Sequence, residues 1–348
     1  MSRPPRVAVV GAGRMGRGIA IAFAGAGVDL DVIDLKPRSS PAWDDLARQA
    51  QQEVGSSLAM LAQLGALTPQ AAAQAPSRVH WVGAQDGDAA LARAEIVFEA
   101  VPETVAAKRD AFARICAHAA HDAILASTTS TLLVTALAEW VTHPERLINA
   151  HWLNPAYLMP LVELSAHART LPSVHARLAA LLERIGKVTV TCAASPGYIV
   201  PRLQALIMNE AARMIDEGVA TAQDIDTATR YGLGLRFAAL GVVEFIDVGG
   251  IDILHHASEH LSAHLSAPRY TAPPVVARMM QLGQTGLKSG QGFYDYRGID
   301  LQAYRLDVMR RILGQVHHLK PPRGADSGTD CGAGSGTDQT NRRASPSL

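Results

Sequence analysis

The hydrophobic and polar positions at the start of the chain change period twice, which predicts a strand, a helix and a second strand. Residues 7–10 form a short β-branched run that suits a buried parallel strand. The glycine-rich string GAGRMG follows at 11–16, and apolar positions at helical spacing continue to Ala24. The next apolar run, 30–33, ends at Asp34. The stretch therefore predicts a βαβ unit of about 30 residues, the frame of many dinucleotide sites.

Further apolar runs predict more strands, and helical patterns separate most of them. The runs cover residues 78–82, 95–100, 123–126, 147–150, 161–164 and 188–191. An Ala/Gln/Leu-rich segment at 43–75 predicts one or two helices. Strands that alternate with helices imply a largely parallel sheet that is covered on both faces. We therefore predict an α/β fold for residues 1–194, a Rossmann-type doubly wound sheet.

The pattern changes after residue 194. A helix that ends at Gly218 is predicted next, and its inner face is marked by Leu203, Ile207, Ala211, Met214 and Ile215. Helical patterns continue to residue 318 without a convincing strand, so residues 195–320 are expected to form an all-α C-terminal domain. Residues 321–348 have almost no large apolar side chains, which predicts a disordered tail.

Composition and charge narrow the classes of function. The 348 residues include 32 basic and 32 acidic ones, so the chain has no formal net charge. Nucleic-acid-binding proteins usually carry a strongly basic face, so we expect no nucleic-acid partner. Three cysteines without metal-ligand spacing predict free thiols, a reducing compartment and no metal site. No apolar run could span a bilayer and no signal peptide is evident, so we expect a soluble cytoplasmic protein without a membrane partner.

The glycine string indicates a dinucleotide site more strongly because it follows a predicted strand and begins a predicted helix. There the glycines allow a tight turn, a close approach of backbone to a pyrophosphate, and close packing of helix on strand. The helix N-terminus offers free N–H groups to phosphates. Asp34 would accept hydrogen bonds from ribose hydroxyls, which favours NAD over NADP, although Lys36 and Arg38 lie close by. The predicted cofactor-binding residues here are Gly11, Gly13, Arg14, Met15, Gly16 and Asp34.

Two further strand ends carry polar side chains. Glu103 and Lys108 follow one apolar run, and Ser127, Thr128 and Ser130 follow the next. The carboxyl ends of parallel strands meet at the edge of the sheet where ligands bind. Ordinary solvated strand exits and a helix cap are the alternative explanations, and the pattern leaves them open.

A histidine and a glutamate in neighbouring runs suggest a general base with its partner. His151 ends one apolar run, just before Asn154-Pro155, and Glu163 stands inside the next run. A carboxylate inside an apolar strand needs a polar partner. Glu163 paired with His151 would form a base and the carboxylate that orients it. A packed core histidine is the alternative.

Together these segments resemble the L-3-hydroxyacyl-CoA dehydrogenase family. The resemblance is carried by GAGRMG, Asp34, EAVPE (99–103), ASTTS (126–130), HWLNP (151–155), MPLVEL (159–164), PGYIVPRL (196–203) and GLKSGQGFYDY (286–296). These segments follow the family's order over nearly all of residues 6–296. The resemblance implies a Rossmann-type domain that binds NAD, an all-α domain that completes the substrate cleft, and a homodimer.

The resemblance also implies a reaction. His151 matches the family's catalytic base, and Glu163 the carboxylate that orients it. Asn154 and Ser130 match positions that contact the reacting oxygen of the small-molecule substrate. The implied reaction is NAD-dependent hydride transfer that interconverts a 3-hydroxyacyl-CoA and a 3-oxoacyl-CoA.

On the cofactor side, Glu103 and Lys108 match positions near the nicotinamide. Ser127 and Thr128 stand in the family's SNT segment near the cofactor, where Thr128 replaces an amide. A further departure is Pro201, which replaces an asparagine near the substrate; we expect it to shift or kink the start of its helix.

The distribution of basic residues bears on whether the substrate carries coenzyme A. Only five of the 32 basic residues are lysines, and residues 37–107 contain none, although family members bind coenzyme A phosphates with lysines in this region. A free 3-hydroxy acid is therefore an alternative substrate, as in the related L-gulonate and carnitine dehydrogenases. Its carboxylate would be bound by Arg202, Arg230 or Arg236.

Two other classes are weighed against this one. A decarboxylating β-hydroxyacid dehydrogenase shares the glycine motif but needs a lysine in a glycine-rich helix start, a setting that neither Lys187 nor Lys288 has. A catalytically silent NAD-binding protein is favoured by Pro201 and Thr128 and disfavoured by the intact set His151, Glu163 and Ser130.

Overall fold

The computed structural model of the chain describes residues 5–265 and 268–319. Its internal contacts separate two units, Met1–Glu210 and Ala211–Leu348, and each is described here by itself. The division falls inside helix α8 (Val200–Asp216). The predicted domain boundary near residue 194 stays a prediction, and the predicted tail at 321–348 lies outside the described residues.

Unit 1 is built on an eight-stranded sheet, and each predicted apolar run forms one of its strands. They are β1 (Val7–Val10), β2 (Leu30–Ile33), β3 (Val79–Val82), β4 (Ile96–Glu99), β5 (Ile124–Ser127), β6 (Leu147–Trp152), β7 (Leu161–Ser165) and β8 (Val188–Cys192). Their order is β3-β2-β1-β4-β5-β6-β7-β8, and every neighbouring pair is parallel except β6 with β7. The first six strands have the order of a doubly wound dinucleotide-binding sheet, so the predicted fold class is confirmed.

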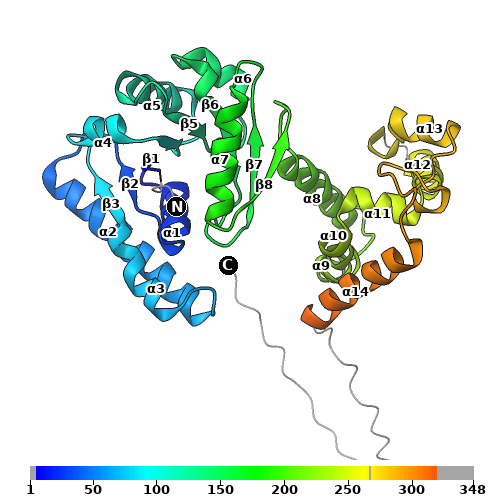
Figure 1. Cartoon of the computed structure of the whole chain (residues 1–348). Helices are drawn as coiled ribbons and strands as arrows, with labels where there is room; N and C mark the ends of the chain where they lie inside the picture. The colour runs from blue at the N-terminus through cyan, green and yellow to red at the C-terminus, as the bar shows by residue number, and fades with distance from the viewer. Residues whose placement is uncertain (1–4, 266–267, 320–348) are drawn as a thin grey trace, which may run out of the picture. The chain divides into compact units, whose positions relative to one another are not determined.

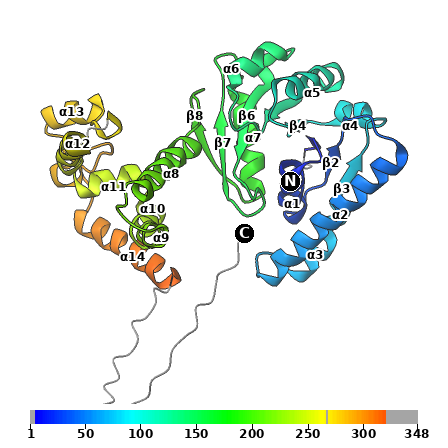
Figure 2. The ribbon, with the colours of Figure 1, turned by 180° about the vertical axis from the view of Figure 1, so that it is seen from behind.

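Helices cover both faces of this sheet (Figures 1 and 2). One face packs on α1 (Arg14–Gly25), α2 (Ser40–Gln63), α3 (Pro69–Gln74) and α7 (Pro172–Arg184). The other packs on α4 (Gly87–Arg93), α5 (Val105–His118) and α6 (Val134–Leu137). Short 3₁₀ turns lie at Ala75–Arg78, Ala138–Trp140 and Pro144–Arg146. Successive residues of a strand point to opposite faces, so Val9 joins the first core and Val10 the second.

The strand register brings polar residues together near the carboxyl edge. Glu99, Ser127 and Asn149 stand in one row across β4, β5 and β6. Two residues further along β6, His151 stands directly opposite Glu163 of the antiparallel strand β7. Because side chains alternate along a strand, Asn149 and His151 project from the same face of β6. The site is assembled on this row and on the loops that follow it.

Helices joined by turns make up the described residues of unit 2, as predicted, and isolated bridges join Gln291 to Gly286 and to Asp295. Its helices are α9 (Ala222–Ala228), α10 (Leu235–Leu240), α11 (Val242–Gly249), α12 (Ile251–Leu265), α13 (Pro274–Gln281) and α14 (Leu301–Leu319). A π-helical turn lies at Thr229–Gly234, and 3₁₀ turns lie at Pro268–Tyr270 and Leu287–Ser289.

The segment GLKSGQGFYDY folds around the buried carboxylate of Asp247 on α11. Asp247 accepts hydrogen bonds from the N–H groups of Phe293 (2.9 Å) and Tyr294 (2.8 Å) and from the Tyr296 hydroxyl (3.2 Å). A Cβ on Gly292 would lie 2.3 Å from Asp247 Oδ1, so that close approach requires glycine. The segment therefore serves to anchor unit 2 internally.

Helix α8 differs from its prediction in one respect. No residue of α8 is buried, and Leu203, Ile207 and Ile215 of the predicted inner face are 43%, 44% and 49% exposed. The periodicity correctly predicted a helix with an apolar stripe, but the stripe is not buried as an inner face would be. Pro201 is the second residue of α8, where a missing N–H removes no hydrogen bond from the helix.

Candidate active site

A cleft of about 870 Å³ lies over the carboxyl edge of the sheet in unit 1, between the segments that follow β1, β2, β4 and β5. Ligands bind at this edge in doubly wound sheets. The predicted site residues that line it are Gly11, Gly13, Arg14, Met15, Asp34, Glu103, Thr128 and Ser130. The structure thus brings together residues from four separate parts of the sequence.

The glycines shape the floor of this cleft. Gly11 has a positive φ of 116°, and a Cβ there would lie 2.5 Å from the Ala100 carbonyl oxygen. A Cβ on Gly16 would lie 1.9 Å from the Gly11 carbonyl oxygen, so the turn closes only without side chains at both positions. Gly13 precedes α1, faces open space in the cleft and leaves the helix N-terminus without a side-chain cap. Exposed N–H groups with no side chain above them fit a phosphate group.

Asp34 lies at the end of β2 with only 6% of its surface exposed. Its carboxylate accepts hydrogen bonds from the Lys36 N–H (3.3 Å) and from the Arg38 guanidinium. The side chain lines the cleft, and its predicted contact with ribose hydroxyls stays a prediction. Arg38 holds the carboxylate in place and brings a positive charge to the same end of the cleft.

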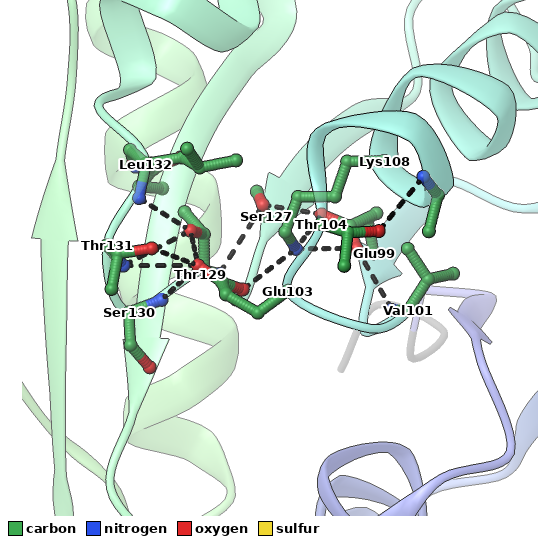
Figure 3. A network of polar contacts seen from close by, with 12 residues as sticks. Glu99, Val101, Glu103, Thr104, Lys108, Ser127, Thr129, Ser130, Thr131 and Leu132 are labelled. Atoms are coloured by element: carbon green, nitrogen blue, oxygen red, sulfur yellow. Dashed lines mark hydrogen bonds and ion pairs between the residues drawn. The ribbon is translucent and has the colours of Figure 1, made fainter.

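Glu103 joins two loops of the cleft (Figure 3). Its Oε1 atom accepts hydrogen bonds from the Thr129 hydroxyl, from the N–H groups of Ser130 and Thr131 (3.1 Å each) and from the Thr131 hydroxyl (2.8 Å). Burial by itself raises the pKa of the Glu103 carboxyl. The Thr129 hydrogen bond, the charge of Lys108 and the Thr131 hydrogen bonds outweigh burial, so that the pKa lies below its ordinary value of 4.5.

The lowered pKa of Glu103 predicts a pH-dependent contribution to the stability of unit 1. A carboxyl whose pKa is lower in the folded state stabilises the fold above its unfolded pKa, and the contribution is lost as the pH falls through the folded pKa. We therefore expect Glu103→Gln to lower the urea midpoint at neutral pH, with a deficit that shrinks below about pH 4.5. Tryptophan fluorescence reports unit 1, because Trp43, Trp81, Trp140 and Trp152 all lie in it. A deficit that is constant with pH, or equal to that of the exposed control Glu139→Gln, would contradict the prediction.

Lys108 and Ser127 lie beneath the cleft and do not line it. The Lys108 side chain is fully buried, and its ammonium contacts Glu99 Oε1 at 2.9 Å and Glu103 Oε2 at 3.3 Å (Figure 3). The buried Ser127 hydroxyl donates to Glu99 Oε2 at 2.6 Å. These contacts hold the strand ends under the loop that carries Ser130. The predicted contacts of Lys108 and Ser127 with the cofactor stay predictions.

The predicted base and its partner are in direct contact. His151 Nδ1 lies 2.8 Å from Glu163 Oε2, with His151 4% and Glu163 0% exposed. The other carboxylate oxygen of Glu163 accepts from the N–H groups of Ile199 and Val200, each at 2.9 Å. An ionised carboxylate only accepts, so Nδ1 carries the hydrogen and Nε2 keeps its lone pair. Such a pair is suited to take a proton from a bound hydroxyl. Asn154 is exposed in the turn after β6.

Sequence reasoning missed Tyr198, which packs on His151, and Asn149, which contacts Tyr198. Tyr198 stacks on the imidazole, with ring centroids 4.7 Å apart and an interplanar angle of 8°. Asn149 donates from its side-chain amide to the Tyr198 hydroxyl at 2.9 Å and to the Leu132 carbonyl at 3.1 Å. Asn149 stands two residues before His151 on one strand, which was the available signal; nothing in the sequence placed Tyr198 beside either of them.

Outside the cleft, helix α12 carries a group of possible metal ligands, His255, His256 and Glu259. Each histidine ring lies 3.4 Å from a different Glu259 oxygen, and both His256 and Glu259 are exposed. The sequence had predicted no metal site. Cys116 and Cys192 are free thiols, and no helix among the described residues is long and apolar enough to cross a membrane.

Comparison with known proteins gives matches along most of the chain. Residues 6–195 match the family model "3-hydroxyacyl-CoA dehydrogenase, NAD binding domain", and residues 197–296 match its "C-terminal domain". A 3-hydroxybutyryl-CoA dehydrogenase of Mycobacterium tuberculosis is 33% identical over 84% of this chain and 98% of its own length. A 5-formyl-3-hydroxy-2-methylpyridine 4-carboxylate 5-dehydrogenase of Mesorhizobium japonicum is 28% identical over 88% of this chain and 96% of its own.

Solved structures give the same result. A 3-hydroxyacyl-CoA dehydrogenase from Archaeoglobus fulgidus has a TM-score of 0.70 at 28% identity, covering 91% of this chain and 99% of that one. A 5-formyl-3-hydroxy-2-methylpyridine 4-carboxylic acid 5-dehydrogenase has a TM-score of 0.65 at 26% identity, covering 90% of this chain and 98% of that one.

The doubly wound sheet, its glycine-floored cleft and these matches define the class of the protein: it is an oxidoreductase of the NAD-dependent dehydrogenase type. Within that class the chain belongs to the 3-hydroxyacyl-CoA dehydrogenase family. The predicted family and the predicted cofactor, NAD, are both confirmed by the match of the NAD-binding domain.

Proposed function

We propose that this protein interconverts a 3-hydroxyacyl and a 3-oxoacyl group by NAD-dependent hydride transfer, with His151 as general base. The observation that carries the proposal is the buried pair of His151 and Glu163 at the end of β6 in a dinucleotide-binding sheet. A neutral histidine held in one tautomer by a buried carboxylate can take the hydroxyl proton as the hydride leaves.

Each residue of the site would have a separate role in this reaction. Bound NAD⁺ supplies the acceptor for the C3 hydride. The α1 N-terminus at Gly13 and the carboxylate of Asp34 would hold its phosphates and its ribose. His151 Nε2 accepts the proton, and Glu163 stabilises the imidazolium that forms. Ser130 and Asn154 would hold the reacting oxygen, and the hydrogen bonds from the loop to Glu103 fix the backbone of Ser130.

Two classes of substrate are candidates. The first is a coenzyme A thioester, supported by family membership and by the 3-hydroxybutyryl-CoA dehydrogenase relatives. The second is a free acid, and a specific observation favours it. Helix α2 carries Asp44, Asp45 and Glu53 against a single basic residue, Arg48, so it opposes a polyphosphate. Lys187 offers no alternative, because its ammonium donates to the carbonyls of Ala156 (2.6 Å) and Met159 (2.9 Å).

Initial rates with 3-hydroxybutyryl-CoA and with free 3-hydroxybutyrate test the proposal and separate the candidates. We expect NAD⁺-dependent oxidation, with NADP⁺ a poor substitute because Asp34 would repel its 2′-phosphate. A kcat/KM about tenfold or more higher for the thioester supports the first candidate, and the reverse ratio supports the second. If neither forms NADH although NAD⁺ binds measurably, the proposed activity is wrong and the silent NAD-binding protein is favoured.

We further propose a homodimer in the cytoplasm. The exposed apolar side chains of α8, together with Val242, Val243 and Ile253 (37%, 38% and 61% exposed), support a second copy of the chain as the partner. The free thiols of Cys116 and Cys192 support a reducing compartment.

A further inference from the structure

Tyr198 has a conformation that needs an explanation. It lies in the turn just before α8, and its φ of 47° is in the left-handed region that few non-glycine residues adopt. Even so, the side chain is 93% buried, with 7% exposed. A large ring held in an unfavourable backbone conformation persists only where its surroundings fix it.

The ring of Tyr198 lies flat against the proposed base. Its plane and the His151 imidazole plane differ by 8°, with the centroids 4.7 Å apart. The Glu163 hydrogen bond reaches the imidazole at Nδ1, and a bond to one atom does not by itself define the tilt of the ring plane. A parallel aromatic ring against the imidazole face limits that tilt and keeps water from this face.

The phenol hydroxyl ties the stack to both sides of the site. It donates to the Thr129 carbonyl at 2.8 Å and accepts from the Asn149 amide at 2.9 Å. Burial is the largest influence on this hydroxyl and raises its pKa, so the hydroxyl stays protonated as a donor. The ring is thereby attached to β6 and to the loop that carries Ser130.

The residues that follow Tyr198 hold the other member of the pair. The N–H groups of Ile199 and Val200 donate to Glu163 Oε1, while Glu163 Oε2 contacts His151. One short segment at the start of α8 therefore contacts the base through its ring and the orienting carboxylate through its backbone.

We propose that Tyr198 is a positioning residue whose stacked ring sets the plane of the His151 imidazole against the Ser130 loop. The proposal rests on the proposed function, since it assigns Tyr198 to the same proton transfer. A base that points at its proton in the right plane matters for the rate and little for binding. The loss of the ring should therefore lower kcat and leave KM and NAD affinity nearly unchanged.

Three variants test this with whichever of 3-hydroxybutyryl-CoA and 3-hydroxybutyrate the wild-type protein oxidises. Tyr198→Leu removes the ring and should lower kcat by about 10- to 100-fold, with the Kd for NAD within about twofold of wild type. Tyr198→Phe keeps the stack and should recover most of that loss. Phe112→Leu removes a buried ring from the core on α5 and should leave kcat unchanged. If Tyr198→Leu does not fold, Tyr198→Met takes its place, since it fills a similar volume without a flat ring.

A double-mutant comparison separates positioning from a general structural role. If Tyr198 acts through His151, Tyr198→Leu should cost little more in a His151→Ala background. Additive losses, a wild-type kcat in Tyr198→Leu, or a Tyr198→Phe as impaired as Tyr198→Leu would each overturn the proposal. If wild type oxidises neither substrate, the proposed function fails, and this inference fails with it. If wild type is active and His151→Ala keeps full activity, the base assignment alone is at fault.

Discussion

His151→Ala should lower kcat by about 10²- to 10⁴-fold, which is the range that a positioned general base contributes. The expectation follows from the geometry of the pair. Glu163 Oε2 lies 2.8 Å from His151 Nδ1 and accepts its hydrogen, so Nε2 is the nitrogen that is able to take a proton. The dinucleotide cleft is lined by other segments, so the Kd for NAD should remain within about twofold.

The measurement is a steady-state kcat with saturating NAD⁺, together with the NAD Kd from tryptophan fluorescence. His175→Ala is the matched control, because its ring is partly exposed on α7 and lies 2.8 Å from Thr191 Oγ1, outside the cleft and the His151 pair. It should behave like wild type. A wild-type kcat in His151→Ala would show that His151 is not the general base. A large loss of NAD affinity would show instead that His151 contacts the cofactor.

Glu163→Gln should reproduce most of that loss for a different reason. A glutamine can still accept from Ile199 and Val200 through its oxygen, and its NH₂ group then faces His151 Nδ1. The imidazole must accept at Nδ1 and carry its hydrogen on Nε2, which is the tautomer that cannot act as a base. Wild-type kcat in this variant would show that the tautomer does not matter.

The strands and the pair were predictable because their signals are local. Buried parallel strands read as short apolar runs, and all eight such runs formed strands. Glu163 was identified because a carboxylate in an apolar strand needs a partner, and the register places it directly opposite His151. The glycine turn was equally local, since a Cβ at Gly16 would meet the Gly11 carbonyl within the same loop.

The residues that were missed depend on contacts between distant segments. Tyr198 reaches Asn149 and Thr129 across 49 and 69 positions of sequence, and no pattern around residue 198 specifies either contact. The direction of a side chain is also not encoded locally. Lys108 lies in the first turn of α5, and its ammonium contacts the buried Glu99 beneath the cleft, a direction that no local pattern specified. The apolar stripe of α8 predicted a helix, but a stripe does not say what will cover it.

Lys108→Met should produce the largest loss of stability, about 3–5 kcal/mol in the free energy of unfolding of unit 1. The methionine fills a similar volume and removes the only cation that contacts the Glu99 carboxylate among the ion pairs of the described residues, while Glu99 stays 1% exposed. Val101 N–H and the Ser127 hydroxyl still donate to Glu99, at 3.0 and 2.6 Å. Hydrogen bonds from neutral groups do not replace a counter-charge at a buried site.

Urea unfolding followed by tryptophan fluorescence measures this loss, and two controls define its origin. Arg48→Met removes an exposed guanidinium of unit 1 that pairs with Asp45, and a surface pair of that kind contributes about 1 kcal/mol or less. The double variant Glu99→Gln with Lys108→Met removes both charges and should recover much of the stability, because the neutral amide can accept from the Val101 N–H through its oxygen and donate to the Ser127 hydroxyl through its NH₂ group. A Lys108→Met protein with wild-type stability and a weakened Kd for NAD would show instead that the ammonium serves the cofactor directly.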